Sequence, residues 1–374
     1  MNAIEILERL VGFPSVAGTP NGAIAGWIGD YLEGHGARVS LLHGPEGDRA
    51  NLFATLGPAE GAGYILSGHM DVVPAGEPEW SSDPFRLRAD GDRLFGRGTA
   101  DMKGFLAAVL AAVPALAAMP LKRPVHIAFS YDEEIGCRGV PHLIARLPDL
   151  CAPPAGAIIG EPSNMQAVRA HKGKAAVRIT ARGRSGHSSR PDLGVNAIHL
   201  MTGVLAKAVE TATALTQGPF DATFEPPYSS LQIGTVTGGQ AINIIPDTCS
   251  ADIEARAISG VSPATLLESV RAAVEALAAA GADIEWTPLS EYPALSLPAD
   301  APLAALLEEL TGMPALAAVS YGTEAGLFQG AGIEAIICGP GDIGRAHRPN
   351  EFIRTGELAA CQAMAEALGA RCTL

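Results

Sequence analysis

The sequence predicts an α/β fold, with a doubly wound, mostly parallel sheet that an inserted ferredoxin-like α+β domain interrupts. Apolar strands alternate with helices before and after the insert, which is the pattern of a parallel sheet. Between them, a strand-helix-strand-strand-helix-strand order begins near residue 175. A length of 374 residues also favours two domains. We therefore expect one discontinuous domain at 1–174 and 288–374, and an insert at 175–287.

The first part of the chain opens with two helices. Apolar residues recur at helical spacing from Ala3 to Val11. The second helix ends at Gly34-His35-Gly36, because glycine is the usual residue after a helix end. Buried or alternating apolar runs then predict the strands. In order, the expected elements are helices at 3–11 and 22–33, strands at 38–42, 51–56 and 64–66, a hairpin at 86–95, a helix at 105–116, and strands at 125–130 and 157–159.

The insert starts with a run at 175–181 that alternates as a half-exposed strand does. After the insert, the strand and helix alternation of the first domain resumes. The elements expected in the insert are strands at 175–181, 231–237, 249–257 and 283–287, with helices at 194–210 and 263–280. Those expected after it are helices at 302–311 and from 323, a strand at 334–338 and a helix at 355–370.

Composition excludes several classes of partner. Asp and Glu outnumber Lys and Arg by 40 to 26, and this acidic balance argues against nucleic acid, whose phosphates need a basic face. Residues 1–11 contain two glutamates and no basic segment, so we interpret them as a helix and not a signal peptide. The longest apolar run, 105–119, contains Pro114 and is too short to span a membrane. The six cysteines have no framework spacing, which predicts reduced thiols and a cytoplasmic protein.

Two motifs first indicate a metal site. In Gly68-His69-Met70-Asp71, His69 follows an apolar strand, so it lies where ligands of open α/β sheets collect. If extended geometry continues, Asp71 lies on the same side and its carboxylate holds the other imidazole nitrogen. Asp101 follows a Gly-rich turn at the start of an apolar helix. Taken alone, a His-x-Asp pair is common by chance and such an aspartate is more often a helix cap.

Further candidates complete a set of ligands for two ions. Glu134 and Glu161 follow two other strands, and His347 lies far downstream. Together with His69 and Asp101 they supply two imidazoles and three carboxylates, enough for two ions that share one carboxylate and hold a water between them. The formal charges of two Zn²⁺, three carboxylates and a bridging hydroxide sum to zero. A single ion would instead leave a buried net negative charge, which is energetically costly. The sequence therefore predicts two zinc ions.

Glu133 is the expected proton shuttle. Adjacent side chains point apart unless the backbone turns, so we assign Glu134 to the metal and Glu133 to the water. Paired zinc ions polarise a carbonyl and generate hydroxide near neutral pH. Glu133 would act as general base and then as acid to the leaving amine, for about 10²–10⁴ in rate. The alternative is that Glu133-Glu134 is a solvated acidic turn.

The order and spacing of these motifs resemble the co-catalytic zinc aminoacylase and carboxypeptidase family over nearly the whole chain. The motifs are Gly68-His69-Met70-Asp71, Gly98-Thr99-Ala100-Asp101-Met102-Lys103-Gly104, Asp132-Glu133-Glu134, Ile159-Gly160-Glu161-Pro162 and Ala346-His347-Arg348-Pro349. Three further segments are most similar to the branch that deacetylates acetylornithine. They are Arg169-Ala170-His171-Lys172-Gly173, Ser185-Gly186-His187-Ser188-Ser189 with Gly194-Val195-Asn196-Ala197, and Tyr321-Gly322-Thr323-Glu324-Ala325.

The resemblance implies how the ligands divide between the ions. Asp101 bridges them, His69 and Glu161 complete one position, and Glu134 and His347 complete the other. It also implies a non-proline cis peptide after Asp101. The implied cofactor is two Zn²⁺ per subunit, with Co²⁺ as a possible substitute, and Asp71 belongs to the catalytic set.

The resemblance further implies that the insert is a lid and dimerisation domain of a homodimer. His187 would reach the partner subunit's site and stabilise the tetrahedral oxyanion, while Asn243 and Arg256 would hold the substrate carboxylate. An arginine suits this role because its planar fork matches a carboxylate. From sequence alone, His187 is a polar loop histidine and Arg256 a strand-edge charge. Thr323 and Glu324 are substrate-binding candidates by their motif only.

The expected activity is that of a zinc-dependent amidohydrolase acting on linear amides. The best-guess reaction converts N2-acetyl-L-ornithine and water into L-ornithine and acetate, in arginine biosynthesis. A succinyl-diaminopimelate desuccinylase ranks lower, because that branch has Gly-Gly-Thr-Ser where this chain has Tyr321-Gly322-Thr323-Glu324. Other N-acyl amino acids, such as acetylcitrulline, and dipeptides stay open.

Two other classes stay as alternatives. A non-catalytic metal-binding module has no need of Glu133. A two-metal phosphoesterase would need a phosphate-binding glycine loop or a basic cluster, and the sequence has neither.

Overall fold

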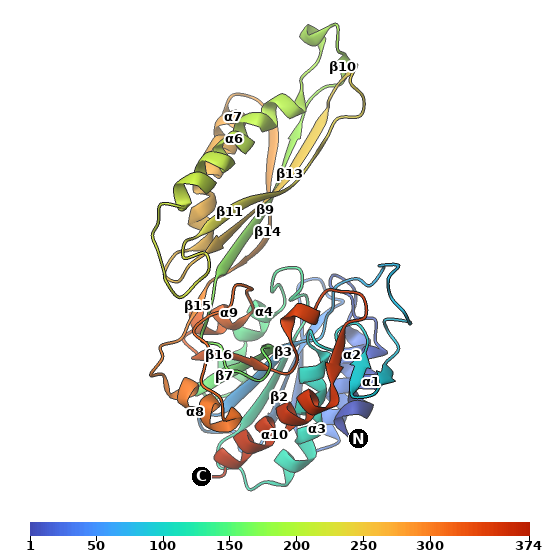
Figure 1. Cartoon of the computed structure of the whole chain (residues 1–374), viewed down its shortest axis with the longest axis vertical. Helices are drawn as coiled ribbons and strands as arrows, with labels where there is room; N and C mark the ends of the chain where they lie inside the picture. The colour runs from blue at the N-terminus through green and yellow to red at the C-terminus, as the bar shows by residue number, and fades with distance from the viewer. The chain divides into compact units, whose positions relative to one another are not determined.

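The computed structural model describes all 374 residues, which divide into two compact units (Figure 1). The first unit comprises Met1–Ala170, Leu295–Ala318 and Thr323–Leu374, and the second His171–Ala294 and Val319–Gly322. The second unit is therefore an insertion into the first. The borders expected from sequence, at 175 and 287, both lie inside the second unit.

A six-stranded sheet in the order β1-β2-β6-β3-β7-β16 forms the centre of the first unit. Its strands are β1 (Arg38–His43), β2 (Ala50–Leu56), β3 (Tyr64–His69), β6 (Val125–Ser130), β7 (Gly156–Pro162) and β16 (Ala335–Gly339). β6, β3, β7 and β16 run parallel, whereas β2 pairs antiparallel with both β1 and β6. The prediction of a mostly parallel sheet is confirmed.

The helices of the first unit bury their apolar faces against this sheet and one another. They are α1 (Ala3–Val11), α2 (Gly22–Glu33), α3 (Lys103–Ala118), α4 (Val140–Ile144), α5 (Leu147–Leu150), α8 (Pro302–Thr311), α9 (Ala325–Gly330) and α10 (Thr355–Arg371), with the 3-10 turn η3 (Ile343–Arg345). Local sequence fixes the start of α1, where Asn2 and Glu5 form a reciprocal capping box. None of the helices is long and apolar enough to cross a membrane.

α3 is the most deeply buried helix, since every residue from Lys103 to Val113 is buried. It contacts α1, α10 and β3, and it continues through Pro114 to Ala118. Glycine in the sheet makes this close packing possible: a β-carbon at Gly160 would overlap the ring of Phe105. Because Asp101 precedes α3 and Glu161 follows Gly160, the same packing brings the two carboxylates to one end of the sheet.

The second unit has the ferredoxin-like order β9, α6, β11, β13, α7, β14, which confirms the predicted α+β insert. Its antiparallel sheet runs β11-β13-β9-β14, with both helices on one face (Figure 1). The elements are β9 (Gly173–Arg182), α6 (Ala197–Leu215), β11 (Ser230–Gly238), β13 (Thr248–Ala257), α7 (Glu268–Ala279) and β14 (Asp283–Tyr292). α6 begins later than the expected residue 194, because Asn196 caps it through the N–H of His199.

The remaining elements are short. A small three-stranded sheet in the first unit includes the predicted hairpin, and short strands and turns border the second unit's sheet. They are β4 (Arg88–Asp90), β5 (Arg93–Phe95), β17 (Phe352–Arg354), β8 (Ala170–His171), β15 (Leu295–Ser296), β10 (Gly186–His187), β12 (Ile244–Ile245), η1 (Pro191–Leu193) and η2 (Pro263–Leu267).

Candidate metal centre

The five candidate ligands predicted from sequence lie together in the first unit. His69 ends β3, Glu161 lies near the end of β7, and Glu134 follows β6 after a short turn. Asp101 lies two residues before the buried start of α3, and His347 follows η3 with a φ of 58°. Parallel strands end at a common edge, so local sequence order accounts for the first three. Only the tertiary fold brings His347 to them.

Asp101 lies between the two histidines. Its Oδ1 is 3.1 Å from Nε2 of His69, and its Oδ2 is 3.2 Å from Nε2 of His347. Glu134 Oε2 lies 3.0 Å from His347 Nε2, and Glu161 Oε1 lies 3.8 Å from His69 Nε2. The two oxygens of one carboxylate therefore face two different imidazoles, each of which has a second carboxylate beside it.

This arrangement fits two divalent ions. With bonds of about 2.0–2.2 Å and tetrahedral angles, two ligand atoms of one zinc lie roughly 3.3 Å apart. The separations of 3.0–3.8 Å around His69 and His347 bracket that value. Imidazole and carboxylate without thiolate are ligands that suit zinc and similar ions. The residues present therefore fit a centre with one shared carboxylate.

Asp71 supports the centre differently from the expectation. Nδ1 of His69 lies 2.9 Å from the main-chain oxygen of Asp71 and 3.6 Å from its carboxylate. The carboxylate instead accepts the main-chain N–H groups of Glu133 and Glu134, each at 3.1 Å. The last residue of β3 is His69, and the Asp71 carboxylate beyond it is directed to the turn that carries the two glutamates and not to the imidazole. One residue thus orients the His69 ring through its carbonyl and the glutamate turn through its side chain.

Glu133 has the environment of a general base. It is half-buried, and its Oε1 accepts the thiol hydrogen of Cys137 at 3.3 Å. Burial raises its pKa to about 8, helped by the negative charges of Glu134 and Asp101 and opposed by His69. One of its oxygens lies within 4.8 Å of ligand atoms of His69 and Glu161. A carboxyl group whose pKa lies near neutrality is suited to move protons in both directions.

Thr323 and Glu324 lie in the first unit and are buried. Glu324 Oε1 accepts the hydroxyl of Ser67 at 2.6 Å, and Oε2 accepts the hydroxyl of Ser130 at 2.8 Å. Ser67 is on β3 and Ser130 ends β6, the strands that lead to His69 and Glu133. The hydroxyl oxygen of Thr323 accepts the N–H of Ala325, the first residue of α9. These contacts favour a role for Glu324 in holding β3 and β6 together, while substrate binding stays a prediction.

Sequence reasoning missed a buried lysine beside the centre. Lys103 is fully buried, and its Nζ donates to the main-chain oxygen of Phe13 at 2.7 Å. Burial lowers the pKa of this amine to about 7. A lone lysine at the start of an otherwise apolar helix was the available signal, because lysine is almost never buried without a partner.

The other three predicted residues lie in the second unit. Arg256 is half-buried and donates through Nε to Glu254 at 2.7 Å and through Nη1 to Tyr292 at 3.2 Å. His187 is exposed, and its Nδ1 accepts the main-chain N–H of Ser189 at 3.2 Å. A nitrogen that accepts an N–H carries no hydrogen, so the neutral ring has its hydrogen on Nε2.

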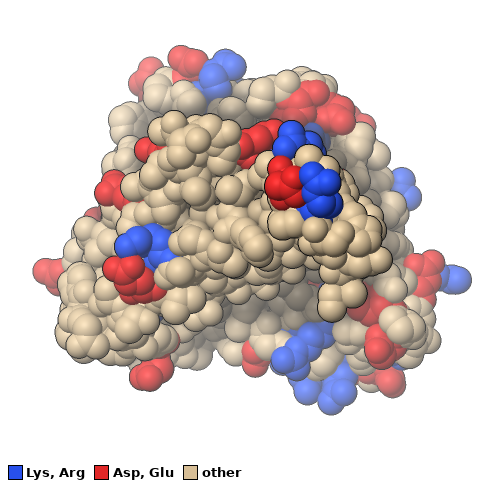
Figure 2. Space-filling view, turned by 90° about the horizontal axis from the view of Figure 1, so that it is seen from above, with Lys and Arg blue, Asp and Glu red and all other residues tan.

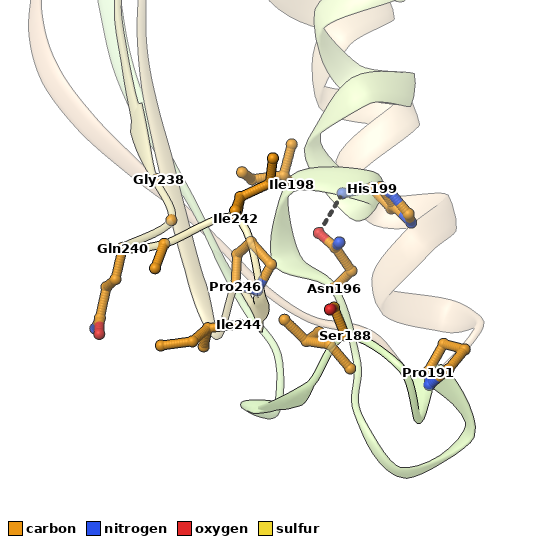
Figure 3. A pocket seen from close by; sticks show the side chains of 13 residues that line it. Ser188, Pro191, Asn196, Ile198, His199, Gly238, Gln240, Ile242, Ile244 and Pro246 are labelled. Carbon is orange, nitrogen blue, oxygen red and sulfur yellow. Dashed lines mark hydrogen bonds between the residues drawn. The ribbon is translucent and has the colours of Figure 1, made fainter.

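Asn243 is also exposed, and its main-chain oxygen accepts the N–H of Ser188. It adjoins a hollow of about 770 Å³ at the β10 end of the second unit, which Figure 3 shows. Ile198 of α6, Ile242 and Ile244 are among the residues that line the hollow. Figure 2 looks onto this end of the unit, and most of the visible atoms belong to uncharged residues. This face is therefore accessible and carries few charged side chains.

Comparisons with known proteins agree with the motifs. Residues 65–370 match the family described as peptidase family M20/M25/M40. The chain is 34% identical over 373 residues to an acetylornithine deacetylase of Yersinia pestis, covering 94% of this chain and 92% of that protein. It is 35% identical over 361 residues to an acetylornithine deacetylase of Proteus mirabilis strain HI4320, covering 94% and 91%.

Solved structures support the fold. The M20 family metallo-carboxypeptidase Sso-CP2 of Sulfolobus solfataricus matches with a TM-score of 0.82 and 19% identity over 100% of both chains. The YXEP protein of Bacillus subtilis, described as a dinuclear metal-binding peptidase from the M20 family, matches with a TM-score of 0.66 and 16% identity, covering 99% of this chain and 97% of that one.

Proposed function

This chain belongs to peptidase family M20/M25/M40 and is a metal-dependent amide hydrolase, and from this premise we propose that it converts N2-acetyl-L-ornithine and water into L-ornithine and acetate. The observation that carries the chemistry is the Asp101 carboxylate, whose two oxygens face His69 and His347. The relatives named acetylornithine deacetylase, similar over 94% of the chain, support the substrate. The proposed place of this reaction is arginine biosynthesis.

We propose two zinc ions as the cofactor, with Co²⁺ as a substitute. His69, Asp101 and Glu161 would hold one ion, and Asp101, Glu134 and His347 the other. When bound, such ions polarise the amide carbonyl and lower the pKa of water. The main-chain oxygen of Asp71 keeps the His69 ring oriented for this role.

Glu133 moves the proton in the proposed reaction. It takes a proton from the attacking water and then gives that proton to the nitrogen of the leaving amine. The Asp71 carboxylate keeps the turn that carries Glu133 in place through two N–H bonds. His187 would donate its Nε2 hydrogen to the oxyanion, which its bond from Ser189 favours.

Arg256 and Asn243 are the proposed partners of the substrate carboxylate. Arg256 already shares its guanidinium with Glu254 and Tyr292, which hold it in one orientation. A guanidinium fixed in this way loses little freedom when it binds a carboxylate. Thr323 and Glu324 stay candidates for recognition of the rest of the substrate.

A second copy of this chain is the proposed partner, through the second unit. The two edge strands of its sheet differ. β14 contains Pro288 and acidic residues, which disfavour pairing with another strand, whereas β11 has no charged residue. Most of β11 is exposed, including Val236 at 52%. An uncharged open edge suits pairing with another strand, so we propose a homodimer formed there. The six cysteines are all free, which supports the proposed cytoplasmic location.

Acetate release tests the substrate. We expect zinc-loaded protein to deacetylate N2-acetyl-L-ornithine with a higher kcat/KM than it shows on succinyl-diaminopimelate, because the relatives share the first activity. The measurement is a side-by-side panel of acetyl and succinyl amino acids and a dipeptide, with chelated protein as the control. Faster turnover of the succinyl substrate would make the protein a desuccinylase. No turnover of any N-acyl amino acid would refute the proposal.

Subunit mixing tests the role of His187 and the dimer together. His187→Ala and Glu133→Gln proteins should each be nearly inactive, yet their heterodimer would contain one intact site. After dissociation and random reassociation, we expect about one quarter of the wild-type activity per chain. The control is His199→Ala, an exposed histidine of the same end, which should keep full activity. If mixing restores nothing although heterodimers form, His187 does not act in the partner subunit's site.

A further inference from the structure

We infer that Glu351 is a positioning residue for the bridging carboxylate: it fixes the main chain of the turn that presents Asp101 to both ions. This inference rests on the proposed function, because it assumes that Asp101 is the shared ligand. Glu351 lies four residues after His347, and its side chain is 1% exposed. No feature of the proposed reaction otherwise requires an acidic residue there.

Three main-chain N–H groups converge on this one carboxylate. Oε1 accepts from Ala100 at 2.8 Å and from Asp101 itself at 3.1 Å, while Oε2 accepts from Gly98 at 2.9 Å. Gly98 has a φ of 81°, which bends the chain so that these N–H groups share one direction. The turn from 98 to 101 is therefore folded around the Glu351 side chain.

Arg97 balances the buried charge. Its guanidinium is fully buried, and Nη1 donates to Glu351 Oε2 at 3.0 Å. Nη2 donates to Glu77 and to the main-chain oxygen of Pro74, both at 3.2 Å. Three N–H groups and one guanidinium therefore satisfy both oxygens of this buried carboxylate.

The position of Asp101 depends on this network because its side chain is short. A shift of its main chain would move Oδ1 away from His69 and Oδ2 away from His347 at once. Glu351 also links the loop after His347 to the segment before Asp101, since its own main-chain oxygen accepts the N–H of Gly96 at 3.0 Å. The loop that carries His347 and the turn that carries Asp101 are thus held in one register. Outer partners of metal ligands typically contribute about 10–100-fold in metal affinity or activity.

The test compares Glu351→Gln and Glu351→Asp with the wild type. The readouts are zinc affinity by titration, the absorption spectrum of the Co²⁺-loaded protein, and the thermal midpoint. The glutamine variant keeps one acceptor oxygen and loses the charge, so we expect folded protein with about 10–100-fold weaker zinc binding and an altered Co²⁺ spectrum. The aspartate variant keeps the charge on a shorter side chain, so its zinc affinity should lie between those of the glutamine variant and the wild type.

Glu357→Gln is the matched control. Glu357 belongs to the following helix, binds Arg345 at 2.8 Å and does not contact the Asp101 turn. We expect this variant to have a lower thermal midpoint and native zinc affinity. If Glu351→Gln is folded and binds zinc as the wild type does with an unchanged Co²⁺ spectrum, the inference is wrong.

Hydrogen exchange of the metal-free wild type tests the same contacts without any substitution. The amides of Ala100 and Asp101 should exchange slowly, and fast exchange at both would overturn the inference even if the variants fail to fold. These readouts do not involve acetylornithine. Failure of the substrate assay with normal metal binding would therefore count against the proposed function alone.

Discussion

Replacing Glu133 by glutamine is expected to lower kcat by about 10²–10⁴ while the protein keeps its metal. The amide has nearly the shape of the carboxylate but cannot take a proton from water and pass it on. The Asp71 bonds to the main chain of Glu133 and Glu134 do not involve the changed side chain, so the ligand Glu134 should stay in place. We therefore expect kcat to fall because proton transfer is lost, and not because the protein unfolds.

The measurement is kcat on N2-acetyl-L-ornithine together with metal content per chain. The acid side of the pH–rate profile should also lose its inflection, since the group that must be deprotonated to act as a base is gone. Glu60→Gln, on an exposed loop, is the control and should behave as the wild type. Activity retained within a few-fold would remove Glu133 from the role of general base.

Asp101→Ala is expected to lose metal from both positions and, with it, all measurable turnover. Both oxygens of this carboxylate face histidines of the centre, so one substitution removes a ligand from each ion. His347→Ala should lose one ion and keep the other, because His69 and Glu161 are untouched. The comparison thus separates a shared ligand from a ligand of one position.

Metal content by elemental analysis after dialysis, at several free zinc concentrations, gives the result directly. Asp149→Ala, an exposed aspartate on α5, should bind as the wild type does. If Asp101→Ala keeps two ions per chain, Asp101 does not bridge them. If it loses no more metal than His347→Ala, the two positions do not depend on a common carboxylate.

The sequence by itself determined the fold class and most of the candidate ligand set. Three apolar strands end at His69, near Glu161 and just before Glu133-Glu134. The rule that parallel strands end at one edge of the sheet was enough to predict that these side chains lie together. The ferredoxin-like insert was equally readable, because β9 and β13 alternate buried and exposed residues as half-covered strands do. These features follow from local patterns, which each segment of the chain carries on its own.

The tertiary structure decided which side chains support the ligands. The pattern suggested that the Asp71 carboxylate would hold the His69 ring, but that carboxylate accepts the N–H groups of Glu133 and Glu134, and the main-chain oxygen of Asp71 contacts the ring instead. Glu351 and Glu324 bind partners about 250 and 257 residues away in the sequence, so no local pattern could pair them. A hydrogen bond joins atoms within about 3 Å, and only the folded chain fixes which distant groups come that close.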